Sequence, residues 1–389
     1  MRLAKSMGRL GTETAFEVLA RARALEAQGR EVVHLEIGEP DFDTPQHIID
    51  AACKALNSGY THYTPSAGIP ELRQAIAEEM SRTRGIPVEP ENVVVTPGGK
   101  PIMFYAILAL AEPGDEVIYP NPGFPIYESM INFTGAKPVP IPLREEYNFA
   151  FDIDEFKKLV TDKTRLIIIN SPHNPTGGIL DKETLHEMAK IAMERDIPVL
   201  SDEIYDRILY DGEFHSIASI PGMQERTIIL NGFSKTYAMT GWRLGYGVMP
   251  KDFAVHITRL MTNSNSCTNA ATQIAGIAAL KGPQDDVDRM VAAFRERRDV
   301  IVNGLNQIPG VSCVLPKGAF YAFPNIKGTG MGSKALADYL LNEAGVACLS
   351  GTSFGAYGEG YLRLSYANSV ENIKKALARM ADAIAKLPK

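Results

Sequence analysis

The sequence is poor in cysteine, with four residues in a chain of 389. No two of them stand at CxxC or metal-ligand spacing, and the seven histidines form no HExxH pair, so we expect no metal site. Thiols scattered in this way are typical of reduced, mostly buried cysteines in a cytoplasmic protein. The four are Cys53, Cys267, Cys313 and Cys348.

The chain also lacks long runs of charge and long apolar runs. Its formal net charge is −6 with both signs interspersed, which argues against a dedicated nucleic-acid-binding protein. No apolar stretch approaches the roughly 18 residues that a membrane span requires, so we expect no membrane association. The N-terminus, MRLAKSMGRL, is basic but has no apolar stretch long enough for a signal peptide. These absences favour a globular protein of the cytoplasm.

What the sequence does contain, between about residues 90 and 280, is an alternation of short apolar runs with longer helical patterns. Runs such as Leu166–Ile169 and Ile228–Leu230 are apolar throughout, which is typical of strands buried on both faces of a mainly parallel sheet. The helical patterns between them include Lys100–Leu110 and Thr184–Arg195, so this region predicts a doubly wound α/β domain. The predicted strands are Val93–Thr96, Glu116–Pro120, Lys137–Ile141, Arg165–Asn170, Pro198–Asp202, Thr227–Asn231 and Gly245–Met249.

A chain of this length exceeds the size of a single core, so we expect two domains. We predict a large domain at residues 39–283 and a smaller α+β domain at 284–389. An N-terminal segment, 1–38, contains a helical pattern and is expected to pack with the small domain. The elements predicted in the small domain are a long helix at Asp286–Gln307, β-like segments at Val311–Leu315, Ala319–Phe323 and Tyr361–Tyr366, and a final helix from Ser369.

Two loops follow predicted strands at the edge where ligands bind in open α/β sheets. The turn Pro97–Lys100, with the sequence PGGK, opens a helix, and its glycines and the helix N-terminus suit an anion. Glycine turns before helices are also common without a ligand. The loop Ser171–Gly178, SPHNPTGG, offers the amide of Asn174 on a turn fixed by prolines, where an ordinary turn is the alternative.

Three charged side chains follow the next strands. Asp202 ends an apolar run and can either face a cationic group or cap a helix. Lys235 adjoins a buried strand end, where lost hydration lowers the pKa of its amine and makes it a nucleophile; a surface lysine is the ordinary alternative. Arg243 stands beside Trp242, the only tryptophan, and suits a phosphate, with a solvated arginine as the alternative.

The order and spacing of these segments resemble the fold-type I pyridoxal-phosphate aminotransferases, in particular the bacterial and archaeal aspartate aminotransferase subgroup. The resemblance runs from about Ala15 to the C-terminus and implies that the large domain binds the cofactor. The matching segments are IGEPDFDTP at Ile37–Pro45, HYTPSAGIPELR at His62–Arg73, TPGGK at Thr96–Lys100, SPHNPTGG at Ser171–Gly178, SDEIY at Ser201–Tyr205, SKTYAMTGWRLGY at Ser234–Tyr246 and YLRLSYA at Tyr361–Ala367.

This resemblance implies that pyridoxal 5'-phosphate is the cofactor and that Lys235 holds it as a Schiff base. The free amine of Lys235 then serves as the general acid and base that moves the substrate proton. Asp202 matches the carboxylate that faces the pyridine nitrogen. Asn174 and Tyr205 match the pair that hydrogen-bonds the phenolic oxygen.

The remaining cofactor contacts also follow from the resemblance. Phe124 matches the aromatic residue that stacks on the ring, where many relatives have tryptophan, and Ile204 matches the residue on the other ring face. Because one phosphate contact comes from the neighbouring subunit in the family, the resemblance also implies a homodimer with shared active sites. The expected phosphate contacts are Gly99, Lys100, Ser234, Arg243 and, from that second subunit, Tyr63.

Substrate contacts are implied by the same family. Arg363 matches the arginine that pairs with the substrate α-carboxylate, helped by Asn174 and the amide of Gly38. Enteric-type aspartate aminotransferases bind the distal carboxylate with an arginine in the segment matching Thr262–Asn269, and no arginine lies there. In the subgroup that this chain resembles, the lysine of the GGK motif takes that role, so Lys100 is the candidate, with a solvated helix-start lysine as the alternative.

The resemblance therefore predicts an enzyme that moves an amino group between an L-amino acid and a 2-oxo acid by a ping-pong mechanism. Aspartate or glutamate with 2-oxoglutarate is the expected pair. An aromatic amino acid or prephenate aminotransferase is the first alternative. A pyridoxal-phosphate β-lyase and a ligand-sensing protein without activity are alternatives of other classes.

Overall fold

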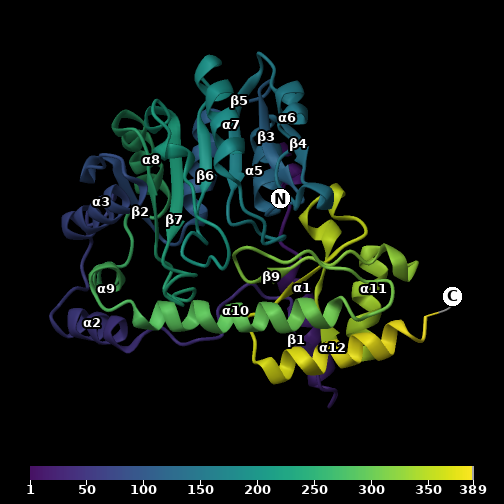
Figure 1. Cartoon of the computed structure of the whole chain (residues 1–389). Coiled ribbons are helices and arrows are strands. Elements are labelled where there is room, and N and C mark those ends of the chain that lie inside the picture. The colour runs from purple at the N-terminus through teal and green to yellow at the C-terminus, as the bar shows by residue number, and fades with distance from the viewer. Residues whose placement is uncertain (388–389) are drawn as a thin grey trace.

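A computed structural model describes residues 1–387 of the chain (Figure 1). Its central sheet has the strand order β2 (Val93–Thr96), β8 (Gly245–Val248), β7 (Thr227–Gly232), β6 (Val199–Asp202), β5 (Thr164–Asn170), β3 (Glu116–Asn121) and β4 (Lys137–Pro142). β8 is antiparallel to both of its neighbours, and the other neighbouring pairs are parallel. The prediction of a mainly parallel α/β sheet is therefore confirmed.

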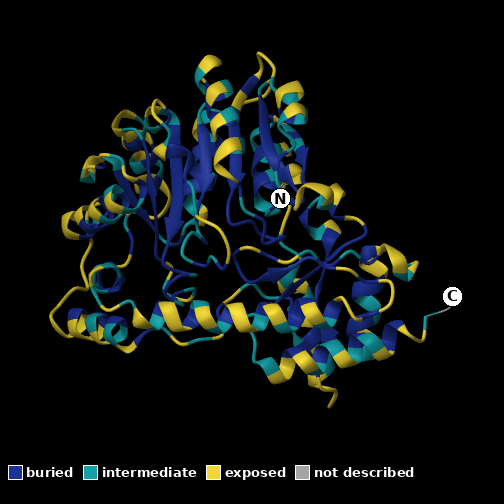
Figure 2. Cartoon of the chain, in the orientation of Figure 1, coloured by how far each residue is buried: buried dark blue, intermediate teal, exposed yellow. Residues whose placement is uncertain are grey.

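Helices cover both faces of this sheet, which is why its strands are apolar at successive positions. On β5, Leu166 and Ile168 pack into the core under α4 (Lys100–Leu110), α5 (Ile126–Thr134) and α8 (Lys251–Ser264). Ile167 and Ile169 point the other way, toward α6 (Ile153–Leu159) and α7 (Lys182–Glu194). Figure 2 shows the strands as the buried layer between these helices. The remaining helices of this part are α2 (Gln46–Asn57), α3 (Pro70–Arg84) and α9 (Ala270–Lys281).

The C-terminal part is built on α10, a helix of 21 residues at Asp285–Leu305. A small antiparallel sheet with the order β11-β12-β9 lies beside it, and α12 packs along α10 (Figure 1). The π-helix η7 directly follows α11. The bounds are β9 (Tyr321–Ala322), α11 (Ser333–Tyr339), η7 (Leu340–Ala344), β10 (Val346–Ala347), β11 (Leu349–Ser350), β12 (Leu362–Ser365) and α12 (Val370–Ile384).

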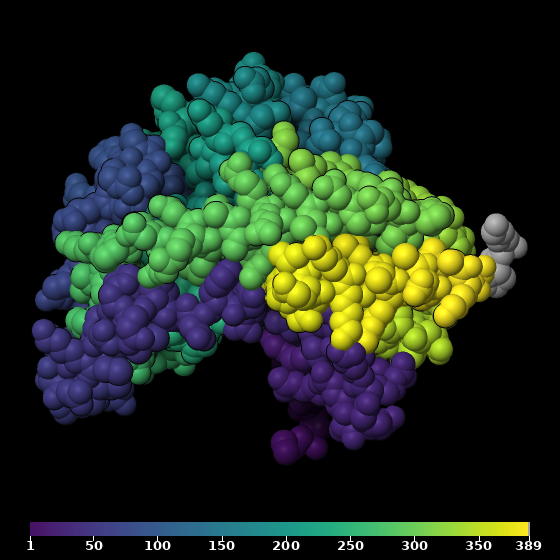
Figure 3. Space-filling view, turned by 60° about the horizontal axis from the view of Figure 1, so that its bottom comes forward, coloured from purple at the N-terminus to yellow at the C-terminus, as the bar shows by residue number. Residues whose placement is uncertain are grey.

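The N-terminal segment packs with this C-terminal part. β1 (Val33–His34) pairs in parallel with β10, and Ala22 of α1 (Ala15–Glu26) packs against Ala347. The carboxylate of Glu31 also pairs with the charged groups of two α12 residues, Lys375 and Arg379. In Figure 3 the purple N-terminal segment accordingly lies against the yellow C-terminal helix.

One predicted element is wrong. Val311–Leu315 is not a strand and makes only an isolated bridge between Ser312 and Asn325. The side chain of Asn306 takes the place of a neighbouring strand, because its Oδ1 accepts from the Cys313 amide at 2.7 Å and its Nδ2 donates to the Cys313 carbonyl.

Short 3₁₀ helices occur at η1 (Lys5–Arg9), η2 (Pro90–Asn92), η3 (Glu145–Tyr147), η4 (Ile217–Ser219), η5 (Gln224–Arg226), η6 (Lys327–Thr329), η8 (Gly351–Phe354) and η9 (Ala356–Gly358).

Residues 1–387 contain neither a membrane-spanning helix nor a cluster of metal ligands. No helix there combines the length and the apolar character needed to cross a membrane. The same residues include no group of three or more histidine, cysteine, aspartate or glutamate side chains arranged to hold a metal ion.

Candidate active site

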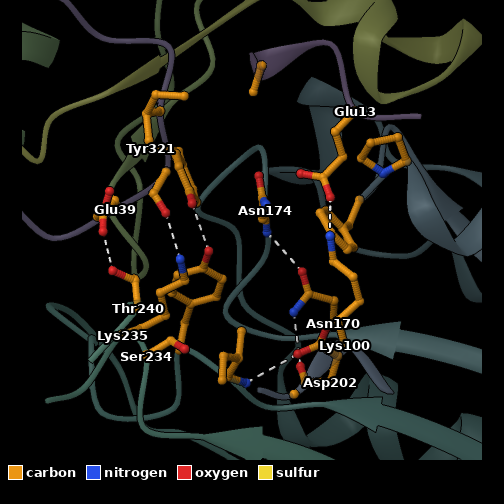
Figure 4. Close-up of a pocket in the computed structure, with 18 of the residues that line it drawn as sticks. Glu13, Glu39, Lys100, Asn170, Asn174, Asp202, Ser234, Lys235, Thr240 and Tyr321 are labelled. Atoms are coloured by element: carbon orange, nitrogen blue, oxygen red, sulfur yellow. Dashed lines mark hydrogen bonds and ion pairs between the residues drawn. The ribbon is translucent and has the colours of Figure 1, made fainter. Parts of the chain in front are cut away.

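A cavity of about 560 Å³ opens at the carboxyl ends of the parallel strands (Figure 4). Its walls come from the central sheet, from the C-terminal part and from two stretches of the N-terminal segment, Glu13–Phe16 and Ile37–Glu39. All the site residues predicted from the sequence line it except Tyr63. Those in the lining are Gly38, Gly99, Lys100, Phe124, Asn174, Asp202, Ile204, Tyr205, Ser234, Lys235, Arg243 and Arg363.

Lys235, just beyond β7, provides a buried amine. Its Nζ donates a hydrogen bond of 2.6 Å to the carbonyl oxygen of Gly38 and lies 5.9 Å from the centre of the Phe320 ring. Burial lowers the pKa of this amine from 10.5 to about 8, an effect that Glu39 opposes and Arg363 reinforces. At neutral pH a far larger fraction of Lys235 is therefore the free, nucleophilic base than of an ordinary lysine.

Asp202, the last residue of β6, provides a buried carboxylate. It accepts hydrogen bonds from the hydroxyl of Tyr127 at 2.5 Å and from the amide of Ile204 at 3.3 Å. Burial raises the pKa of this carboxyl from 3.8 to about 6, while these two hydrogen bonds lower it. The group thus has neutral donors on one side and the cavity on the other, which suits a ligand with a protonated nitrogen.

The side chain of Asn170 connects the end of β6 with the loop after β5. Its Nδ2 donates to the carbonyl of Asp202 at 2.9 Å, and its Oδ1 accepts from the backbone N–H of Asn174, also at 2.9 Å. The hydroxyl of Tyr205 lies 2.7 Å from that of Tyr321, and burial raises the pKa of Tyr205 well above 10. These contacts fix polar groups on one wall of the cavity.

Backbone amides and a guanidinium converge at one end of the cavity. Gly98 has φ of +90°, and a Cβ there would lie 2.2 Å from a guanidinium nitrogen of Arg243. A Cβ at Gly245 would likewise collide with the backbone of Gly98 and Gly99, where α4 begins. With Ser234 also in the lining, this end combines a helix N-terminus, a hydroxyl and an arginine, which together suit a phosphate.

Arg363, on β12, provides another cation in the lining. One of its terminal nitrogens lies 3.4 Å from Oδ1 of Asn174, and the other donates to the carbonyl of Glu36. Its guanidinium lies 4.5 Å from the centre of the Tyr321 ring, and burial lowers its pKa. Within residues 1–387 its Nε has no hydrogen-bond partner, although the side chain is only 4% exposed. A buried guanidinium with a spare donor is suited to a carboxylate ligand.

The profile of the family Aminotransferase class I and II matches residues 30–380. The chain belongs to this family. An aspartate aminotransferase of Pyrococcus horikoshii is 45% identical, over 95% of this chain and 93% of that protein. An aromatic-amino-acid aminotransferase of Thermococcus litoralis is 43% identical, over 91% and 92%. The solved structure of the aspartate aminotransferase from Thermus thermophilus with maleate has a TM-score of 0.95 at 39% identity, over 98% and 100%.

The protein is thus a pyridoxal-phosphate-dependent aminotransferase, which moves an amino group between an amino acid and a 2-oxo acid. The residues in the cavity fit this cofactor on three independent grounds. Lys235 offers an amine whose pKa burial lowers, and Asp202 offers a buried carboxylate to which no cationic side chain of residues 1–387 is bonded. The cradle at Gly98 has no room for a Cβ beside Arg243.

Among the residues that sequence reasoning missed are Asn170, Tyr321 and Glu13 in the lining, and Tyr127, which contacts Asp202 from outside the lining. Asn170 ends a predicted strand, so its position was a usable signal. Tyr127 stands near the start of α5, and Tyr321 lies in the predicted segment Ala319–Phe323, but nothing in the sequence marks either hydroxyl. Glu13 had no signal at all, because its contact is with Lys100, 87 residues away.

Tyr63 of the aminotransferase is the predicted site residue that stands apart. Its side chain is 90% exposed and does not line the cavity of its own chain. An exposed aromatic residue of this size has apolar area available for another surface.

Proposed function

We propose that this aminotransferase binds its substrates between Lys235 and Arg363 and prefers aspartate or glutamate with 2-oxoglutarate as the acceptor. The observation that carries the proposal is that three cations line the same cavity: the buried guanidinium of Arg363, the amine of Lys235 and the more exposed ammonium of Lys100. A dicarboxylic amino acid complements these charges.

The chain's residues take the following parts in holding the cofactor. Asp202 would face the ring nitrogen, and Asn174 and Tyr205 would donate to the phenolic oxygen. Phe124 and Ile204 would cover the two faces of the ring. The phosphate would be held by Ser234, Arg243 and the backbone amides of Gly99 and Lys100. Once bound, the cofactor supplies an electron sink that labilises the bonds to the substrate's α-carbon.

Lys235 then moves the proton. Its amine would hold the cofactor, and its Nζ, when free, would take up the proton from the substrate's α-carbon and return it. A base with a pKa of about 8 accepts and returns a proton readily near neutral pH. The carbonyl of Gly38, which accepts from the same Nζ, keeps the amine oriented toward the cavity.

Arg363 orients the substrate by pairing with its α-carboxylate through its free Nε and a terminal nitrogen. Asn174 and the backbone of Gly38 assist it. Because Arg363 is buried, the pair is little screened by water, and exclusion of water during closure strengthens it further. Replacement of Arg363 by lysine is expected to raise KM for every amino acid, since a lysine cannot make two parallel hydrogen bonds.

Lys100 is proposed to bind the distal carboxylate. The measurement is kcat/KM for aspartate, glutamate, phenylalanine, tyrosine and alanine, each with 2-oxoglutarate, in the wild type and in Lys100→Ala. We expect aspartate or glutamate to rank first and to lose at least about tenfold in the variant through KM, with phenylalanine nearly unchanged. Equal losses for all five substrates would refute the role of Lys100. An aromatic amino acid in first place would favour the specificity named for the Thermococcus litoralis relative.

We further propose a homodimer in which Tyr63 of one subunit completes the phosphate site of the other. Its 90% exposure in the single chain supports this assignment. In a mixed dimer of Tyr63→Ala and Lys235→Ala subunits, the site on the Tyr63→Ala subunit has its own Lys235 and receives an intact Tyr63 from the other subunit. The second site lacks both side chains, so the mixed dimer has one intact site of its two. Refolding the two inactive variants together should therefore restore about a quarter of wild-type activity. No recovery in a mixture that forms mixed dimers would contradict a shared site.

A further inference from the structure

Residues 5–16, here called the N-terminal strap, run from a contact with α5 to the wall of the cavity, which Glu13–Phe16 help to line. One end is anchored on α5, where Arg9 donates to the carbonyls of Asn132 at 2.7 Å and Phe133 at 2.9 Å. The amide of Gly11 also donates to Oγ of Ser129 at 2.8 Å. The other end continues into α1, which packs with the C-terminal part. Between the two anchors, residues 10–13 have no helix or strand.

Glu13 projects from this stretch into the cavity, two residues after the anchor at Gly11. Its carboxylate forms an ion pair with the ammonium of Lys100, as the dashed line in Figure 4 shows. The side chain of Glu13 is 20% exposed and that of Lys100 is 47% exposed, so the pair is partly shielded from solvent. The charge of Glu13 also acts on the two buried cations, because it opposes the lowering of the pKa of both Lys235 and Arg363.

We infer that Glu13 is a specificity-determining residue that occupies the subsite of the substrate's distal carboxylate, so that a dicarboxylic substrate must displace it from Lys100. The inference rests on the proposed role of Lys100. A carboxylate of the chain and a carboxylate of the substrate have the same charge and the same donor, so one ammonium at a partly open site exchanges one for the other. Substrates without a distal carboxylate leave the pair intact.

The fold allows this exchange without loss of the strap. The anchors at Arg9 and Gly11 lie before Glu13, and α1 begins after it, so only the short stretch between them has to move. Ion pairs of this exposure contribute little individually, which keeps displacement within reach of a substrate carboxylate. Glu13 thereby narrows the advantage of dicarboxylic over monocarboxylic substrates.

The experiment measures the affinity of the holoenzyme for maleate, a dicarboxylate with no amino group, by titration calorimetry. Glu13→Gln should bind maleate about fivefold more tightly than the wild type, the ratio expected from loss of one such competing pair. Glu17→Gln, an exposed carboxylate on the first turn of α1, is the matched control and should not change the affinity. In a Lys100→Met background, Glu13→Gln should have a much smaller effect, because the competition needs the ammonium and only the longer-range repulsion between Glu13 and the dianion remains.

A second readout follows the strap itself by hydrogen exchange of peptides covering residues 10–16. Maleate should speed exchange there in the wild type, and Glu13→Gln should exchange fast without it. The inference is overturned if Glu13→Gln leaves maleate affinity unchanged, or alters alanine and aspartate kinetics equally. A selective loss of ornithine turnover would also overturn it, because Glu13 would then bind an amine. If Lys100→Met alone leaves maleate binding intact, the proposed distal site fails, and the inference fails with it; transamination of alanine is independent of both.

Discussion

The amine of Lys235 and the carbonyl of Gly38 are joined by a hydrogen bond of 2.6 Å across 197 residues of sequence. Two residues earlier, the carbonyl of Glu36 accepts from the guanidinium of Arg363. A single short stretch of backbone, residues 36–38, therefore holds two of the cations that line the cavity. The position of the Lys235 amine relative to the Arg363 guanidinium is thereby fixed, although one comes from the central sheet and the other from β12. One amino-acid substrate can then contact both groups.

The reactivity of Lys235 should follow its lowered pKa. An acylating reagent attacks only the free base, so in the cofactor-free protein the labelling rate of Lys235 should rise with pH and level off above about pH 8. Ordinary exposed lysines, with a pKa of about 10.4, should still be gaining reactivity there. Competitive labelling followed by peptide mass spectrometry gives both curves at once. A Lys235 curve coinciding with that of the exposed lysines would contradict the effect of burial.

Replacing Tyr127 by phenylalanine should change the pH dependence of the reaction. The variant removes a hydrogen bond that lowers the pKa of Asp202, so that pKa should rise above its wild-type value, which is about 6 in the cofactor-free protein and lower where a cationic ring nitrogen faces the carboxylate. We expect kcat/KM to fall severalfold at the acid end of the pH profile and to recover toward pH 9. Tyr119→Phe, a buried tyrosine bonded to Glu128 outside the cavity, is the control. An equal loss at every pH would point to a packing defect instead.

Asp202→Asn should stabilise the cofactor-free protein while abolishing its function. The folded-state pKa of about 6 lies above the ordinary 3.8, so the stability contributed by the neutral carboxyl is present below pH 3.8 and lost as the pH rises through 6. Asparagine carries no charge and avoids that loss, so the free energy of unfolding at pH 8 should increase by at most about 3 kcal/mol. Its side-chain oxygen can still accept the hydrogen bond from the Tyr127 hydroxyl. Urea unfolding at pH 8 and pH 4 tests the difference, with exposed Asp154→Asn as the control. Destabilisation at pH 8 would contradict the account.

Gly98→Ala should weaken cofactor binding. Its Cβ would lie 2.2 Å from the guanidinium of Arg243 and would displace a charge-assisted contact to the phosphate, which costs about tenfold or more in affinity. Gly29→Ala is the control for backbone strain, because Gly29 has a similar φ of +84° and open space around it. The measurement is the affinity of the cofactor-free protein for pyridoxal phosphate. Equal affinity in the two variants would show that the cradle at Gly98 does not bind the phosphate.

The sheet was predictable from the sequence because burial on both faces leaves a local signal in each strand. The runs at β5 and β7 are apolar throughout, and the polar residues that follow them identified Asn174 and Lys235. The prediction of a strand at Val311–Leu315 was wrong because the side chain of Asn306, and not a neighbouring strand, bonds the backbone N–H and C=O groups there. The division of the chain at residues 38 and 283 stays a prediction.

The parts of the site that the sequence did not predict are contacts between distant segments. Tyr127 reaches Asp202 across 75 residues, and Tyr321 reaches Tyr205 across 116. Neither tyrosine differs locally from the other buried tyrosines of the chain. Glu13 lies outside every motif, and only the fold brings it to Lys100.

The most direct test of the central claim is a half-reaction of the purified holoenzyme with one amino acid and no acceptor. Aspartate, glutamate, phenylalanine, tyrosine and alanine would be added in turn, and absorbance and released products followed. We predict a near-stoichiometric change to the absorbance of the aminated cofactor, with one 2-oxo acid formed per site and no ammonia, and no change in Lys235→Ala. Continuous release of ammonia and a 2-oxo acid, with the cofactor spectrum restored, would mean that the site catalyses elimination and not amino transfer.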